Sequence, residues 1–200
     1  LDYIKSLGDF DVICLQEVAR YMSGYCSSDQ RDQLELAQQH FPNYRALWGS
    51  GFSWPSASND PAHRQEFGNL TLVKSNLLDF KVHQLPQPAV PDKWQMPRVA
   101  IEVCVDSSIG PLSIINTHLA FHDSNEVQQQ LGHLQAIERD RLAHIQFPKA
   151  AGPGSFQPGY LASARILCGD FNFDPEFPHY QYQLDSGWID TWKLCCPDSP

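Results

Sequence analysis

Three short polar motifs in this chain combine the residue types that bind phosphate and divalent metal ions. They are Gln16-Glu17, Asn116-Thr117-His118 and Asp170-Phe171-Asn172. A carboxylate such as Glu17 is a hard oxygen ligand that suits Mg²⁺, and a second carboxylate such as Asp170 can orient or deprotonate a water molecule. The imidazole of His118 and the amide of Asn172 can donate hydrogen bonds to phosphoryl oxygens. Together these residue types fit a metal-assisted attack of water on a phosphate ester.

Each motif follows a short apolar run that is typical of a buried strand. The runs cover residues 11–15, 112–115 and 166–168. Because side chains alternate along a strand, Asn116 and His118 share one face, and Asp170 and Asn172 do so if their strand continues. Ligand sites form where strand ends meet in an α/β domain, so we expect these side chains to lie close together.

Taken one at a time, the motifs have structural alternatives. Glu17 alone fits a charged residue that leaves the sheet, and His118 alone fits a structural histidine at a strand end. The segment Gly169-Asp170-Phe171-Asn172 also fits a turn held by side-chain-to-backbone hydrogen bonds. Only the combination of all three motifs in one chain makes the catalytic interpretation specific.

The rest of the chain predicts an alternation of helices and strands. Helical spacing of apolar residues predicts helices at 1–7, 29–40 and 123–145. Apolar or alternating runs predict strands at 11–17, 44–48, 67–74, 98–105, 112–118 and 165–169, with a hairpin that joins 98–105 to 112–118. Composition rich in Gly, Ser and Pro predicts loops at 49–66, 84–97 and 148–163. Mixed strands with covering helices predict an α/β layered domain.

The order of the three strand-end motifs resembles the endonuclease/exonuclease/phosphatase family. That family includes apurinic endonucleases, deoxyribonucleases, sphingomyelinases and inositol polyphosphate phosphatases, and the resemblance extends from Asp11 to about Pro197. It implies a two-sheet α/β sandwich with outer helices, formed by residues 1–200 as a single, incomplete catalytic domain. It also implies a Mg²⁺-dependent hydrolase of phosphate esters, with Mn²⁺ as an alternative metal, acting as a phosphodiesterase, nuclease or phosphatase.

The resemblance implies roles for individual residues. Glu17 matches the family's metal-binding glutamate, and His118 matches a position that contacts phosphate, with Asn116 beside it. Asp170 matches the residue that positions or activates the attacking water. Asn172 matches its partner at the phosphate.

Three further candidates come from shorter matches. The segment Ile189-Asp190-Thr191-Trp192 resembles one whose aspartate orients a catalytic histidine, so Asp190 is a candidate catalytic residue that acts through that histidine. Gly68-Asn69-Leu70 and Arg98 resemble segments beside the site. Asn69 and Arg98 therefore join Asn116 as candidate substrate-binding residues, with a structural role as the favoured alternative for Asn69 and Arg98.

Two family motifs have no counterpart in this sequence. The asparagine near the metal on the family's first strand would lie before Leu1, and the final Ser-Asp-His motif has no match because the chain contains no Asp-His pair. We therefore expect a catalytic domain that is truncated at both ends. The alternative is a non-catalytic binding module that retains the fold and has lost the chemistry.

Composition narrows the class of protein and of substrate. Of the 200 residues, 42% are hydrophobic and 18% are charged, which is typical of a globular domain and not of a disordered chain. The net charge of −9 lowers the expectation of tight DNA binding without excluding it. The expected partner is a phosphate-ester substrate, with a nucleic acid, a phospholipid head group and a phosphorylated small molecule as the open alternatives.

The sequence also gives expectations about membrane segments, cellular location and the cysteines. No apolar run is long enough to span a membrane, so no integral membrane segment is expected. No basic and apolar leader follows Leu1, which favours a cytoplasmic location. The six cysteines include no Cys-x-x-Cys spacing, and Cys14, Cys104 and Cys168 are expected to be small buried side chains in strands.

Overall fold

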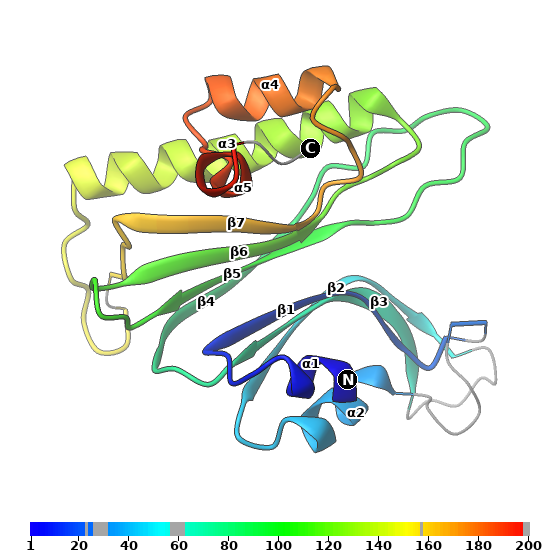
Figure 1. Ribbon diagram of the computed structural model, residues 1–200, viewed down its shortest axis with the longest axis horizontal. Coiled ribbons are helices and arrows are strands. Elements are labelled where there is room, and N and C mark those ends of the chain that lie inside the picture. Colours follow the sequence, from blue (N-terminus) through cyan, green and yellow to red (C-terminus); the bar gives the residue numbers. More distant parts are fainter. Residues whose placement is uncertain (23, 26–31, 57–62, 157, 198–200) are drawn as a thin grey trace.

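Two β-sheets packed face to face form the centre of the computed structural model (Figure 1). The structure describes residues 1–22, 24–25, 32–56, 63–156 and 158–197. The first sheet has the strand order β1-β3-β2, with β1 (Val12–Arg20), β2 (Arg45–Pro55) and β3 (Arg64–Val73). The second sheet has the order β4-β5-β6-β7, with β4 (Leu77–Gln84), β5 (Val99–Val105), β6 (Leu112–His118) and β7 (Ala164–Asp170).

Helices cover the outer faces of both sheets (Figure 1). On the first sheet lie α1 (Asp2–Ser6) and α2 (Gln33–His40), and on the second lies α3 (Ser124–Gln146), followed in the chain by α4 (Pro178–Asp185) and α5 (Thr191–Cys195). Apolar side chains fill three layers, beneath α1 and α2, between the two sheets, and beneath α3. This arrangement confirms the predicted two-sheet α/β sandwich with outer helices. None of the described helices is both long and apolar enough to cross a lipid bilayer.

Most of the predicted helices and strands agree with the structure. The helix predicted at 123–145 is α3, and the Asp123 side chain caps it by accepting hydrogen bonds from the backbone N–H groups of Asn125 (2.9 Å) and Glu126 (3.0 Å). The predicted hairpin is the antiparallel pair β5–β6. The helix predicted at 29–40 agrees with α2, although residues 29–31 lie outside the described part of the chain.

The loop predicted at 49–66 is wrong, because β2 continues to Pro55 and β3 begins at Arg64. The glycines that suggested a loop instead permit close packing. A Cβ atom on Gly49 would lie 2.8 Å from Cγ1 of Ile101 in the facing sheet. Glycine in a strand often marks such a close approach. Residues 57–62, at the centre of the predicted loop, lie outside the described residues.

β4, α4 and α5 are not among the predicted elements. β4 is an edge strand that pairs with β5 alone, and none of its residues is fully buried. Its residues 78–83 do alternate between apolar and polar, which is typical of a half-buried strand, and the prediction missed this pattern. α4 and α5 have eight and five residues, which is too short for a helical period to stand out.

The strand directions bring the predicted site residues to one end of the second sheet. β5 runs antiparallel to β6 and β7 runs parallel to it, so the start of β5 meets the ends of β6 and β7. His118 pairs with Asp170, and the N–H of Leu119 donates to the Asp170 carbonyl at 2.9 Å. Gly169 has a φ of 133°, and a Cβ atom there would lie 1.8 Å from the carbonyl oxygen of Thr117. Only glycine fits this close contact between β6 and the end of β7.

Candidate active site

Glu17 lies in a bulge of β1. The register between β1 and β3 shifts between Leu15 and Val18, which leaves Gln16 and Glu17 outside the regular pairing. Glu17 has a φ of 56° and is exposed. A left-handed conformation is unfavourable for a residue with a side chain and clusters at functional sites. The bulge is tied to the second sheet because Nε2 of Gln16 donates to Oδ1 of Asn116 at 2.7 Å.

Asn116 joins the two sheets beneath this bulge. It is fully buried, and its Nδ2 atom lies 3.2 Å from the carbonyl oxygens of Leu15 and Leu70 and from Oγ1 of Thr71. Buried amide groups need such partners, and each unpaired one would cost about 1–3 kcal/mol. These contacts support a role for Asn116 in holding β1 against β6. Its predicted contact with substrate stays a prediction.

Asn69 has a comparable position on β3. Its side chain is buried, and Nδ2 donates to the carbonyl oxygen of Val99 at 2.8 Å. Val99 begins β5 directly after Arg98. The contact therefore anchors the start of β5, and with it Arg98, against the first sheet. A direct role of Asn69 in substrate binding stays a prediction.

Arg98, His118 and Asp170 form a chain of contacts. Nη1 of Arg98 lies 3.0 Å from Nδ1 of His118, and Nε2 of His118 lies 3.8 Å from Oδ2 of Asp170. Guanidinium nitrogens only donate hydrogen bonds, so Nδ1 of His118 must be the acceptor. The neutral ring then carries its proton on Nε2, the atom that faces Asp170. The contact with Arg98 therefore leaves His118 with its N–H on the side of Asp170.

The surroundings of His118 also keep its ring neutral. Burial, with a further contribution from the positive charge of Arg98, lowers the pKa of His118 to about 4, and the Asp170 carboxylate opposes this only in part. Burial likewise lowers the pKa of Arg98, while Glu17, Glu126 and Asp170 act in the opposite direction. Arg98 stays cationic because its ordinary pKa is above 12. Its Nε atom is buried and, among the described residues, has no hydrogen-bond partner.

Asp170 and Asn172 form a turn at the end of β7. Oδ1 of Asp170 accepts from the backbone N–H of Asn172 at 2.9 Å, and Asn172 has a φ of 54°. Nδ2 of Asn172 donates to the carbonyl oxygen of Leu119 at 2.8 Å. The turn that the sequence offered as a structural alternative is therefore present. It leaves Oδ2 of Asp170 and the second Nδ2 hydrogen of Asn172 for other partners.

A cleft of about 640 Å³ opens at this turn. Its lining residues come from the β1 bulge, the end of β7 and the segment after β7, and are Gln16, Gly169, Asp170, Phe171, Asn172, Phe173, Asp174 and Phe177. The Asp170 side chain is 54% exposed in it. A water molecule can therefore reach the carboxylate.

Asp190 lies in a different setting. It caps α5, where its Oδ1 accepts from the backbone N–H of Lys193 at 3.1 Å and its Oδ2 accepts from the hydroxyl of Tyr180 at 2.8 Å. These two hydrogen bonds lower the pKa of Asp190. Its described contacts therefore hold α4 and α5 together. The predicted role in orienting a catalytic histidine stays a prediction.

The donor groups at the cleft suit a hydrated magnesium ion. The described part of the chain contains no cluster of three or more His, Cys, Asp or Glu side chains that could hold a metal ion. Mg²⁺ usually keeps several waters and takes one or two carboxylates together with substrate phosphate oxygens. The exposed carboxylate of Glu17 in its bulge fits such a ligand, and its neighbour Gln16 lines the cleft together with Asp170.

An aromatic group beside Arg98 was not among the predicted site residues. The ring of Phe121 lies 3.6 Å from that of His122, and Trp94 lies 5.2 Å from His122 on the other side. The guanidinium of Arg98 stands 5.8 Å from the Phe121 ring centre. Trp94 and Phe121 are 61% and 52% exposed. The sequence signal was a tryptophan in a polar, proline-rich segment, where no core is expected.

Comparison with known proteins finds likeness only at the level of three-dimensional structure. No family model and no curated protein matches this sequence. An endonuclease/exonuclease/phosphatase family protein from Bacteroides thetaiotaomicron is 16% identical, with a TM-score of 0.61 over 96% of this chain and 59% of that one. The mannosyl-6-phosphatase Bt3783 of the same species is 15% identical, with a TM-score of 0.60 over 96% and 62% of the two chains.

A third similar structure is TDP2 from D. rerio in complex with a single-strand DNA product. It is 17% identical, with a TM-score of 0.53 over 99% of this chain and 62% of that one. The chain thus spans about three fifths of the length of each of these three proteins. Together with the strand order and the two-layer packing, these similarities show that the chain has the fold of the endonuclease/exonuclease/phosphatase family.

Proposed function

We propose that this protein hydrolyses phosphate esters with the help of Mg²⁺ or Mn²⁺. The observation that carries the proposal is the convergence of three strand ends, in which the neutral His118 presents Nε2–H toward the exposed Asp170 carboxylate. We assign Glu17 to the same site because the Gln16 side chain beside it is bonded to Asn116 on β6, the strand that carries His118. An exposed carboxylate at a cleft, with a neutral donor and a buried cation behind it, suits phosphoryl chemistry.

Each residue has a defined task in this proposal. Glu17 holds the cation, which neutralises charge on the phosphoryl and leaving oxygens when it is bound. Asp170 orients the attacking water and accepts its proton. His118, through Nε2–H, and Asn172, through its free Nδ2 hydrogen, donate to the phosphoryl oxygens as charge develops on them. Arg98 keeps His118 in the donor tautomer through the 3.0 Å contact with Nδ1.

The direct test is a hydrolysis assay on the complete natural polypeptide. We expect release of nitrophenol from bis(p-nitrophenyl) phosphate with Mg²⁺, and loss of that activity when a chelator removes the metal. Restored activity on re-addition of Mg²⁺ would exclude damage by the chelator. Absence of turnover on DNA, phospholipid and sugar phosphates alike, with substrate binding retained, would instead favour the non-catalytic binding module.

The aromatic group beside Arg98 supports a finer proposal on substrate. Exposed rings of Trp94 and Phe121 can stack on a flat ring next to the scissile phosphate, and base stacking on such rings contributes about 1–3 kcal/mol per base. A net charge of −9 disfavours long polyanions. We therefore infer a nucleotide or the end of a nucleic acid strand as substrate. The TDP2 structure with its single-strand DNA product is in line with this inference.

Trp94→Ala should raise KM for a nucleoside phosphodiester by about 5–150-fold, the equivalent of the stacking energy. KM for a glycerophosphodiester, which has no ring to stack, should change little. Phe147→Ala is the matched control, because Phe147 is 70% exposed and follows the far end of α3. Equal changes in KM for both substrates would refute the stacking role of Trp94.

A further inference from the structure

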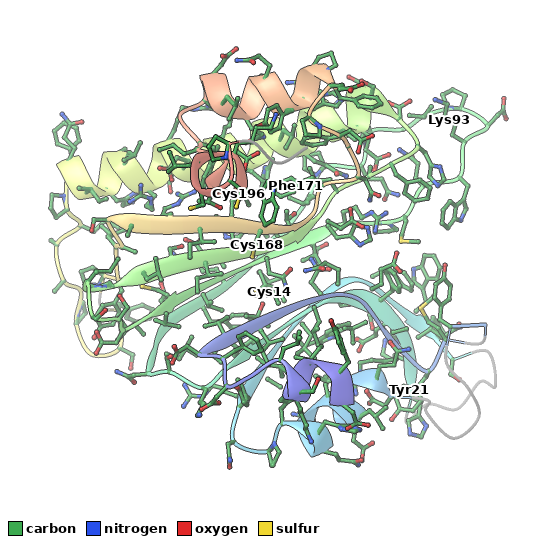
Figure 2. All side chains as sticks on the ribbon, viewed as in Figure 1. Cys14, Tyr21, Lys93, Cys168, Phe171 and Cys196 are labelled. Carbon is green, nitrogen blue, oxygen red and sulfur yellow. The ribbon has the colours of Figure 1, made fainter. Side chains whose placement is uncertain are left out.

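Two cysteines face each other across the two sheets. Cys14 lies on β1 and Cys168 on β7, the strands that form matching edges of the two sheets, and Figure 2 labels both. Both side chains pack against the apolar layer between the sheets, which includes Val103 and Ile114. Some Cα atoms of β1 and β7 lie within 8 Å of each other, closer than the usual spacing of about 10 Å between packed sheets.

The hydrogen bonds of Asn116 fix the two cysteines relative to each other. Cys168 is the direct neighbour of Asn116 in the β6–β7 pairing, and the Asn116 amide donates to the carbonyl of Leu15, the residue after Cys14. The Cys168 thiol donates to the carbonyl oxygen of Ile115 at 3.6 Å. A disulfide needs short Cβ separations and side chains that point toward each other, and both cysteine side chains point into the same apolar layer between the sheets.

The two thiols differ in acidity because each acts on the other. Their interaction raises the pKa of the Cys14 thiol and lowers the pKa of the Cys168 thiol. Cys168 is therefore the thiol that loses its proton more readily. Both cysteines are half-buried and free, so a small oxidant has a path to them.

We propose that Cys14 and Cys168 are an oxidation site that forms an intramolecular disulfide with a peroxide as the oxidant. The Cys168 thiolate attacks a peroxide oxygen, the O–O bond breaks, and the leaving hydroxide takes up a proton to become water. The Cys14 sulfur then attacks the resulting sulfenic acid, the S–O bond breaks, and a second water leaves with the Cys14 proton. Two thiols lose two electrons and two protons, and one peroxide is reduced to two waters.

The bridge would join the strand that carries Glu17 to the strand that carries Asp170. Cys14 precedes the β1 bulge by two residues, and Cys168 precedes Asp170 by two. The proposal concerns the cysteines alone, so it holds or fails independently of the phosphoesterase proposal.

The test is peptide mapping after treatment with hydrogen peroxide and alkylation of the remaining thiols. We expect a linked pair of peptides that contain Cys14 and Cys168, lighter than the sum of the two by two hydrogen atoms, and its disappearance after reduction. The oxidised protein should melt higher by about 10 °C or more, because the bridge closes a long loop. Cys104→Ser is the matched control and should keep the bridge, since Cys104 lies on β5.

The variants Cys14→Ser and Cys168→Ser should each abolish the linked peptides. Peptide mapping of the oxidised wild-type protein tests the proposed bridge even if a variant fails to fold. Recovery of Cys14 and Cys168 in separate peptides after full oxidation would overturn the proposal. So would a bridge from Cys168 to Cys195 or Cys196 in equal amount.

Discussion

Replacing Asp170 by Asn is expected to lower kcat by roughly 10²–10⁴-fold, the usual scale for loss of a general base. The amide oxygen can still accept from the backbone N–H of Asn172, so the turn after β7 should persist. The amide cannot take a proton from water, so the chemical step should suffer while folding does not. Steady-state kinetics with Mg²⁺ and a thermal melt of the same preparation measure both quantities.

Asp174→Asn is the matched control for this substitution. Asp174 lines the same cleft and loses the same charge, but it lies beyond the β7 turn and has no contact with His118 in the described chain. If the kcat values of the Asp170→Asn and Asp174→Asn variants are the same, Asp170 does not activate the attacking water.

Replacing Glu17 by Gln should weaken Mg²⁺ binding by at least about 100-fold. Mutation of residues that only hydrogen-bond to a metal ligand already lowers metal affinity by about 10–100-fold. The amide removes the negative charge that a hard cation requires. Gln has the same shape and meets the same backbone demand at a φ of 56°. Turnover at fixed Mg²⁺ should fall with the loss of the ion. Calorimetric titration with Mg²⁺, with circular dichroism for the fold, separates the two effects.

Glu35→Gln serves as the control for charge, because Glu35 is exposed on α2, on the outer face of the first sheet. It removes the same charge from the molecule far from the bulge. A Mg²⁺ titration of Glu17→Gln that coincides with that of Glu35→Gln would take Glu17 out of the metal site.

The sequence predicts the layered fold and the meeting of strand ends because both follow from local patterns. Apolar runs mark β1, β6 and β7. The motifs of β6 and β7 lie at the ends of those strands, whereas β1 continues past Glu17 to Arg20, so the predicted strand end at Glu17 is wrong. Parallel and antiparallel pairing then brings the ends together, as His118 and Asp170 show by pairing across β6 and β7. The residue types of the candidate site can therefore be recognised from short segments of the sequence.

Other features depend on contacts between distant residues, and no local pattern carries them. The bulge that gives Glu17 its left-handed backbone requires the register of β3 as well as β1. The tautomer of His118 depends on Arg98, twenty residues away in the sequence. The close approach at Gly49 depends on Ile101 in the other sheet. Each of these three features forms only when the two sheets are packed together, so the sequence of one segment cannot predict it.

Glu17 and Asp170 belong to different sheets, which Asn116 ties together through its hydrogen bonds to Leu15 and Leu70. In the proposed mechanism, the position of Glu17 relative to Asp170 would depend on how one sheet is packed on the other. A misplacement of about 1 Å can cost about 10²-fold in rate. Apolar residues such as Val103 and Ile114, which fill the space between the sheets, would then affect the rate of the proposed reaction. Selection at these buried positions would then act on enzymatic activity as well as on the stability of the fold.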